Sequence, residues 1–154
     1  IHVYTSLLVL PAAFTQFIPY FRKHMPRVHR WGGWFYATVV ILLAGPSGFV
    51  IGIYANGGVP SQIAFCTLAV LWVLFTVIAI NKIRKRKYAE HQHFMIRSFA
   101  LALSAITLRL WKVILVYLFE PGPMDVYRIV AWLGWVLNLV VAEIIIYKMK
   151  NKKP

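Results

Sequence analysis

Five ionisable side chains in or beside long apolar stretches have the clearest potential for chemistry in this sequence. They are His29, His91, Arg97, Arg109 and Glu143. A charged or titratable group inside a membrane is costly, so a residue of this kind is a functional candidate by default. The residue types narrow the chemistry to metal ligation by imidazole and to binding of polar or charged groups by guanidinium and carboxylate.

The two histidines are candidate ligands of a cofactor iron. His29 and His91 each lie near the start of an apolar segment, on the same predicted side of the membrane. Two neutral imidazoles at one depth would suit the iron of haem b. The competing interpretation is that histidines beside basic clusters are solvated or contact lipid headgroups. His2 has no second histidine at its depth, so a relay with two haems is not predicted.

The charged candidates fall into a predicted pair and a separate arginine. Arg97 and Glu143 are predicted at similar depths, and an ion pair would lower the cost of placing both charges in the membrane. That pair would organise packing, or Arg97 would balance the charge of a haem propionate or a quinone oxygen. Arg109 lies about 22 Å along its predicted helix, too far to pair with Glu143. It would bind an anionic group or, with Lys112, anchor the helix at the outer interface.

The elements that position these residues follow from the composition. The chain has 154 residues, of which 60% are hydrophobic and 14% charged. Soluble domains are about 45–50% apolar and about 25% charged, so a soluble domain is excluded. Each of about five apolar segments is close to the ~20 residues that span a bilayer as a helix. The segments are 1–19, 33–54, 61–81, 94–119 and 126–147. We therefore predict one domain over 1–154, an all-α integral membrane bundle of about five transmembrane helices.

The charge distribution predicts the orientation. The chain has 17 basic and 4 acidic residues, and most basic residues fall in clusters around 22–30, 82–87 and 148–153. An alternating path places these clusters on one side, in predicted loops near 20–32 and 82–92 and in the C-terminal tail. The opposite loops near 55–60 and 120–125 contain no Lys or Arg. The positive-inside rule then makes the basic loops and the tail 148–154 cytoplasmic and the N-terminus external, in what we expect to be a bacterial cytoplasmic membrane.

The same charge suggests which partners to expect. Basic clusters at a membrane surface attract anionic lipids, whereas no nucleic-acid recognition module accompanies them, so nucleic-acid binding is not predicted. Ile1 lies inside an apolar run and is not a methionine, so we expect native residues to precede it.

Two stripes of small residues could accept a flat partner. Ala44, Gly48 and Gly52 recur every four residues, which favours close helix packing within the chain, a homo-oligomer or contact with a cofactor ring. A second stripe follows the fourth segment and consists of His91, Met95, Ser98, Ala102, Ala105, Arg109 and Lys112. Its small middle could receive a helix, a porphyrin or a quinone.

Motifs for other chemistry are absent from the sequence. There is no Walker loop, dinucleotide fingerprint, zinc-protease motif or nucleophile elbow. Cys66 lies within an apolar segment, where an inert thiol is expected. No enzyme class is predicted.

A set of short motifs gives the chain a family resemblance. The motifs are His29-Arg30-Trp31-x-Gly33, Asn56-Gly57-Gly58, His91-x-x-Phe94-Met95-Ile96-Arg97-Ser98-Phe99-Ala100, Thr107-Leu108-Arg109-Leu110 and Ala131-Trp132-x-x-Trp135-x-x-Asn138-x-x-x-Ala142-Glu143. In this order they resemble a family of predicted multi-pass bacterial membrane proteins catalogued as a domain of unknown function. The resemblance implies a membrane protein and adds His2 and Asn138 to the five candidates as motif positions, but it supplies no reaction.

Two functional interpretations follow. The first is an electron-transfer membrane protein that binds haem b or quinone near the cytoplasmic face through the five candidate residues. The alternative is a cofactor-free accessory subunit or small transporter, whose polar residues organise packing and bind lipid or a membrane-protein partner. Transporters usually place ionisable groups near the middle of the membrane, and most of the candidates lie nearer the inner edge.

Overall fold

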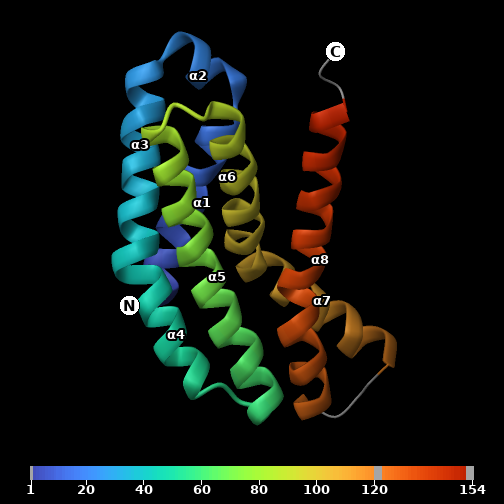
Figure 1. Ribbon diagram of the computed structural model, residues 1–154. Coiled ribbons are helices and arrows are strands. Elements are labelled where there is room, and N and C mark those ends of the chain that lie inside the picture. The colour runs from blue at the N-terminus through green and yellow to red at the C-terminus, as the bar shows by residue number, and fades with distance from the viewer. Residues whose placement is uncertain (1, 120–122, 152–154) are drawn as a thin grey trace.

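The chain folds into a bundle of helices (Figure 1), seen in a computed structural model that describes residues 2–119 and 123–151. Every secondary-structure element of these residues is a helix, as the sequence predicts. In chain order they are α1 (His2–Phe17), α2 (Pro19–His24), α3 (Pro26–Val39), the π-helical turn η1 (Val40–Ala44), α4 (Gly45–Ile53), α5 (Val59–Arg84), α6 (Tyr88–Ala102), α7 (Ser104–Phe119) and α8 (Pro123–Asn151).

Within the described residues, three helical stretches are long and apolar enough to cross a membrane. They are Pro26–Ile53, Val59–Arg84 and Met124–Asn151, and the bent pair α6 and α7 makes up to four. At 16 residues, α1 is shorter than the ~20 residues that span a bilayer. By length, the structure therefore supports three or four of the five predicted spans.

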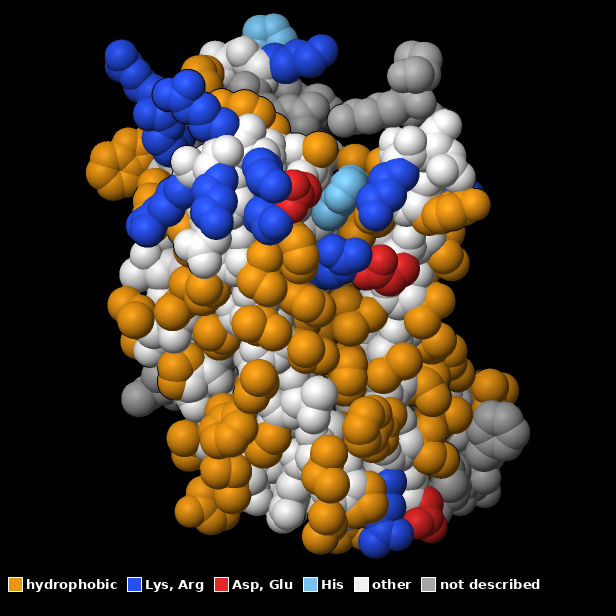
Figure 2. Space-filling view, in the orientation of Figure 1, with side chains coloured by type: hydrophobic (Ala, Val, Ile, Leu, Met, Phe, Trp, Pro, Cys, Tyr) orange, Lys and Arg blue, Asp and Glu red, His pale blue; other side chains and the backbone are white. Residues whose placement is uncertain are grey.

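The two ends of the bundle differ in charge. Figure 2 shows Lys and Arg side chains gathered at the end that holds α2, the α5–α6 turn and the C-terminal end of α8, which we call the basic end. The end that holds the α4–α5 loop and the start of α8 is the loop end. Between them the visible face is mostly hydrophobic, and large apolar side chains such as Leu42, Val113 and Val141 are exposed. An apolar surface of this extent suits contact with lipid.

Helices extend further into the basic end than predicted. The sequence placed a loop near 20–32, but α2 and the start of α3 occupy it, separated by Met25. The predicted loop 82–92 shrinks to the three residues between α5 and α6, where Arg86 has a φ of 57°. The predicted tail begins inside α8, which continues to Asn151. Lys and Arg are good helix formers, so a polar cluster need not end a helix.

A proline accounts for the π-helical turn within the second predicted segment. Pro46 has no N–H to donate and its ring crowds the carbonyl four residues earlier, which favours a wider turn before it. Ser47 Oγ donates to the Leu43 carbonyl at 2.5 Å and so helps to satisfy the loosened backbone. The helix therefore continues from Pro26 to Ile53 instead of spanning 33–54.

The fourth predicted segment, 94–119, is not a single helix. It breaks at Leu103 and bends by 42° between α6 and α7. The predicted stripe from His91 to Lys112 is therefore interrupted, and Arg109 does not lie on a straight continuation of the helix that carries Arg97. Figure 1 shows α7 turning away from the bundle at this break.

Gly52, the last residue of the predicted stripe of Ala44, Gly48 and Gly52, packs closely against α5 of the same chain. A Cβ placed on Gly52 would lie 3.1 Å from the backbone nitrogen and the Sγ of Cys66 on α5. The close approach of α4 and α5 confirms intramolecular packing at this position. The core lies deeper in the bundle, where α1, α3, η1, α5, α6 and α8 contribute Val9, Tyr36, Val40, Trp72, Leu101 and Trp135.

Candidate functional site

The predicted pair of Arg97 and Glu143 is confirmed. Arg97 on α6 donates from Nε to Glu143 Oε1 at 2.5 Å and from Nη2 to Oε2 at 2.9 Å, a two-pronged contact that joins α6 to α8. The Phe94 ring lies under the guanidinium, with its centroid 5.0 Å from Cζ. The Glu143 side chain is 53% exposed and that of Arg97 is 20% exposed. The carboxylate therefore keeps room to accept a further hydrogen bond.

The two histidines lie near the basic end. His91 Nδ1 is 2.8 Å from the carbonyl oxygen of Ala79, which only accepts, so Nδ1 carries the proton. In the neutral imidazole this leaves Nε2 as an acceptor or metal ligand. The half-buried His29 lies in the first turn of α3. His2 lies at the start of α1, and its side chain is outside the described part of the chain.

Arg109 is separate from the other candidates. It lies on α7 beyond the break, exposed, and its Nη1 donates to the carbonyl of Ala105 in the preceding turn at 2.9 Å. Within the described residues the arginine that binds Glu143 is Arg97 and not Arg109, as predicted. The guanidinium folds back on its own helix.

Asn138 binds the backbone at the break between α6 and α7. Its Nδ2 donates to the Ala100 carbonyl and to Thr107 Oγ1, both at 3.0 Å. Thr107 Oγ1 in turn donates to the Gly134 carbonyl on α8 at 2.5 Å. Carbonyls in the last turn of a helix lack intrahelical donors, so the α8 amide fulfils a need that the break creates. The family resemblance marked this position without assigning a role to its side chain.

Four buried side chains form a hydrogen-bonded ring that the sequence analysis missed. Trp72 Nε1 donates to Tyr36 Oη at 3.1 Å, Tyr36 Oη lies 2.7 Å from Ser98 Oγ, and Ser98 Oγ lies 2.8 Å from Thr76 Oγ1. Thr76 donates its single proton to the Trp72 carbonyl at 2.8 Å. Counting protons therefore sets the direction as Trp72 to Tyr36 to Ser98 to Thr76. This ring joins α3, α5 and α6 with its polar groups mutually satisfied.

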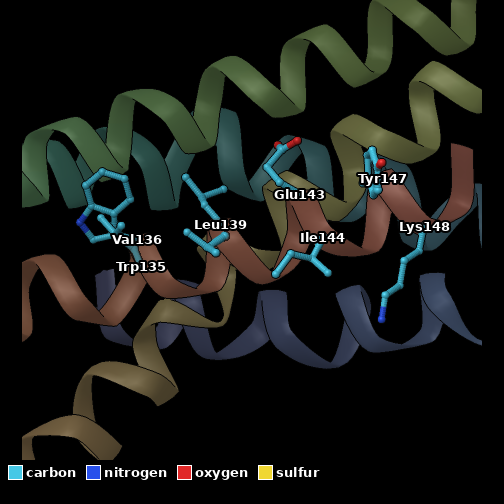
Figure 3. Close-up of a pocket in the computed structure, with 8 residues that line it drawn as sticks. Trp135, Val136, Leu139, Glu143, Ile144, Tyr147 and Lys148 are labelled. Atoms are coloured by element: carbon cyan, nitrogen blue, oxygen red, sulfur yellow. The ribbon is translucent and has the colours of Figure 1, made fainter. Parts of the chain in front are cut away.

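A groove runs along α8 from Trp135 to Lys148 and includes Glu143 of the Arg97–Glu143 pair. Its volume is about 560 Å³, and the described residues that line it are Trp135, Val136, Leu139, Val140, Glu143, Ile144, Tyr147 and Lys148. Figure 3 shows these side chains spread along the helix, a length of about 20 Å at helical rise. The volume lies within the range of roughly 300–1,000 Å³ that small-molecule sites occupy.

The groove is mostly apolar, and its polar side chains lie towards the basic end. Val136, Leu139 and Val140 line the middle, and Glu143, Tyr147 and Lys148 lie towards the basic end. At the other end, Trp135 is only 5% exposed, and its Nε1 has no hydrogen-bond partner among the described residues. Buried donors normally have a partner, but this N–H is itself enclosed by the protein, so a ligand in the groove does not reach it directly.

A second cavity of about 180 Å³ lies beside the α6–α7 break. Ala44, Gly48 and Gly52 of the α4 stripe line it together with Ala102 and Ala105 from either side of the break. The two predicted small-residue stripes thus meet here. Neither His29 nor His91 is among the described residues that line either cavity.

The described side chains do not gather into a multidentate metal site. No group of three or more His, Cys, Asp or Glu residues could hold a metal ion in the described part of the chain. Cys66 is partly buried, and its Sγ lies 3.8 Å from the Phe49 carbonyl. This contact joins α5 to α4.

Comparisons with known proteins bear on the whole chain. The family model described as "Predicted membrane protein (DUF2306)" matches residues 1–146. This range includes the motifs that carry the resemblance and all five candidate residues. No curated protein and no solved structure matches the chain.

Proposed function

The chain belongs to the DUF2306 family of predicted membrane proteins, and on that premise we propose that it binds a membrane quinone in the α8 groove. The observation that carries the proposal is the groove itself, which is apolar along most of its length and has Glu143, Tyr147 and Lys148 towards the basic end. A quinone has a flat ring with carbonyl oxygens and an apolar tail. The ring would lie near Glu143 and Tyr147, and the tail would follow Val140 towards Trp135.

The mixture of donors and acceptors at the basic end favours this ligand. Tyr147 and Lys148 can donate to a quinone carbonyl, and the Glu143 carboxylate can accept from a quinol hydroxyl. Both redox forms would therefore find a partner. A phospholipid phosphate fits less well because the Glu143 carboxylate would repel it.

Binding can be tested with two matched variants on α8. Val140 lines the groove and is 49% exposed, whereas Val141 is 55% exposed and is not among the described lining residues. Decylubiquinone is titrated into detergent-purified protein, and tryptophan quenching reports binding. We expect Val140→Trp to weaken binding at least about tenfold, or 1.4 kcal/mol. Val141→Trp should leave it within about twofold; equal effects of the two changes would remove the groove as the site.

Haem b is a second candidate ligand, favoured by the orientation of His91. Metal-ligating histidines usually donate their other ring N–H to a carbonyl or carboxylate, and His91 does so to Ala79. We propose Nε2 of His91, with His29, as the ligands. An absorption spectrum of protein produced with ample haem, oxidised and then reduced with dithionite, tests this. A low-spin spectrum lost in His91→Ala supports ligation, and its absence from wild-type protein contradicts it.

The proposed setting is a membrane with the basic end in the cytoplasm. The excess of Lys and Arg at that end supports this orientation. We also propose α1 as a fifth span, because it contributes the buried residues Val9 and Ala13 to the interior of the bundle. In the ring of Tyr36, Trp72, Thr76 and Ser98 the polar groups bind one another. This supports a packing role for these four residues, whether or not the protein binds a cofactor.

A further inference from the structure

The turn between α5 and α6 presents consecutive basic side chains. Arg84, Lys85, Arg86 and Lys87 are all exposed. Arg86 has a φ of 57°, in the left-handed region that non-glycine residues seldom adopt. This conformation lets α6 begin at Tyr88, directly after the turn, and concentrates the four cations in one place.

Three of these four side chains have no carboxylate partner among the residues that the structure describes. Each carboxylate that the structure describes is already paired: Glu90 with Lys82 and Lys87, Glu143 with Arg97, and Asp125 with Arg128. Among the described residues, Arg84, Lys85 and Arg86 therefore form no ion pair. Their charge is available to an anion from outside the protein.

Helix α3 extends this basic surface and adds aromatic rings. The Trp34 ring lies against Arg84, with its centroid 5.9 Å from Cζ. Arg30 and Arg27 precede Trp34 by one and two helical turns, so they share its face of α3. Trp31, on the same helix, is 78% exposed. Tryptophan of this kind is enriched where apolar chains meet lipid headgroups.

We propose that Arg84, Lys85 and Arg86, together with Arg27 and Arg30, bind the phosphate of an anionic phospholipid headgroup. Charge complementarity favours an anion, because the chain carries a net charge of +13 and these side chains form no ion pair within residues 2–119 and 123–151. The exposed tryptophans and the end of the long α5 helix place the surface at headgroup depth. This differs from the α8 groove, where Glu143 supplies a carboxylate.

The test compares two lipids with identical acyl chains. Protein in a nonionic detergent is titrated with phosphatidylglycerol or phosphatidylcholine, and native mass spectrometry counts bound lipid. Each basic residue near an anionic surface contributes about 1 kcal/mol, so we expect phosphatidylglycerol to bind at least about tenfold more tightly. Equal binding of the two lipids would overturn the proposal.

Variants assign the preference to this surface. Lys85→Gln with Arg86→Asn removes two charges, and asparagine tolerates the left-handed conformation at position 86. Arg27→Gln with Arg30→Gln tests the α3 side without altering the turn. Both double variants should reduce the preference, whereas Lys112→Gln with Lys150→Gln, which removes two exposed charges away from this surface, should retain it.

Two further results would contradict the proposal. An unchanged preference in both test variants would place lipid binding elsewhere. Displacement of phosphatidylglycerol by an equal concentration of inorganic phosphate would assign the surface to soluble phosphates. Quinone binding by the same variants, measured in parallel, reports whether the protein is still folded.

Discussion

The contact between Arg97 and Glu143 shows how two charges can be accommodated inside an apolar bundle. The guanidinium makes two hydrogen bonds to the carboxylate and rests on the Phe94 ring, so most of the cost of burying the arginine is offset locally. Because the carboxylate is half exposed towards the groove, the pair can hold α6 against α8 and still present an acceptor to a ligand.

The energetic coupling of this pair is the first prediction. A double-mutant cycle with Arg97→Gln and Glu143→Gln should give a coupling of roughly 0.5–3 kcal/mol by unfolding in detergent. Arg128 and Asp125 serve as the control, because their N···O distance is 3.7 Å and both are exposed. That pair should couple by about 0–1 kcal/mol. If the effects of Arg97→Gln and Glu143→Gln on the free energy of unfolding are additive, the pair does not stabilise the packing of α6 against α8.

The buried ring around Tyr36 gives the second prediction. Tyr36→Phe leaves Trp72 Nε1 without its acceptor and removes the donor to Ser98 Oγ, which keeps only its bond to Thr76. We expect a loss of about 1–3 kcal/mol in the free energy of unfolding. Tyr54→Phe is the control, because Tyr54 is exposed at the loop end. If the two variants are equally stable, water or a rearrangement of neighbouring side chains supplies the hydrogen bonds that Tyr36→Phe removes.

At the level of the helices, the break at Leu103 determines how α7 and α8 meet. Asn138 and Thr107 connect the freed backbone of α6, the first turns of α7 and the middle of α8. The groove begins close to these contacts, at Trp135. A loosened break would therefore change both the packing of α7 and the shape of the site.

Hydrogen exchange can measure the contribution of Asn138. Asn138→Leu removes the donor to Ala100 and Thr107. If this lowers the free energy of local opening by about 1.4 kcal/mol, the amides after Leu103 exchange about tenfold faster. Asn81→Leu, at an exposed position on α5, should leave these amides unchanged. If these amides remain protected from exchange in Asn138→Leu, packing alone stabilises the backbone at the break between α6 and α7.

Much of the helical architecture was predictable, because a long apolar run between basic clusters is best explained as a helix that spans a membrane. The break was not predictable, since Ala102-Leu103-Ser104 contains neither glycine nor proline. The Arg97–Glu143 pair followed from matching depths on two helices. The Tyr36 ring did not, because its members look like ordinary apolar-segment residues until three helices bring them together. The α8 groove likewise depends on how helices are placed, which periodicity does not specify.

For the whole molecule, the separation of charge is the feature that sets its place in the membrane. In a Cys66→Ser background, Lys85→Cys should react with a membrane-impermeant maleimide only after cells are opened. Asn56→Cys, in the α4–α5 loop, should react in intact cells. A several-fold difference in labelling is expected in each case, and the reverse pattern would place the basic end outside the cell.

Photolabelling is the most direct test of whether the groove along α8 binds a quinone. Wild-type protein is irradiated with an azido-ubiquinone, and the labelled peptides are located by mass spectrometry with decylubiquinone as competitor. We predict competed labelling within residues 135–148, the range that lines the groove. Labelling confined to the cavity residues between Ala44 and Ala55, or labelling that decylubiquinone does not reduce, would contradict the assignment.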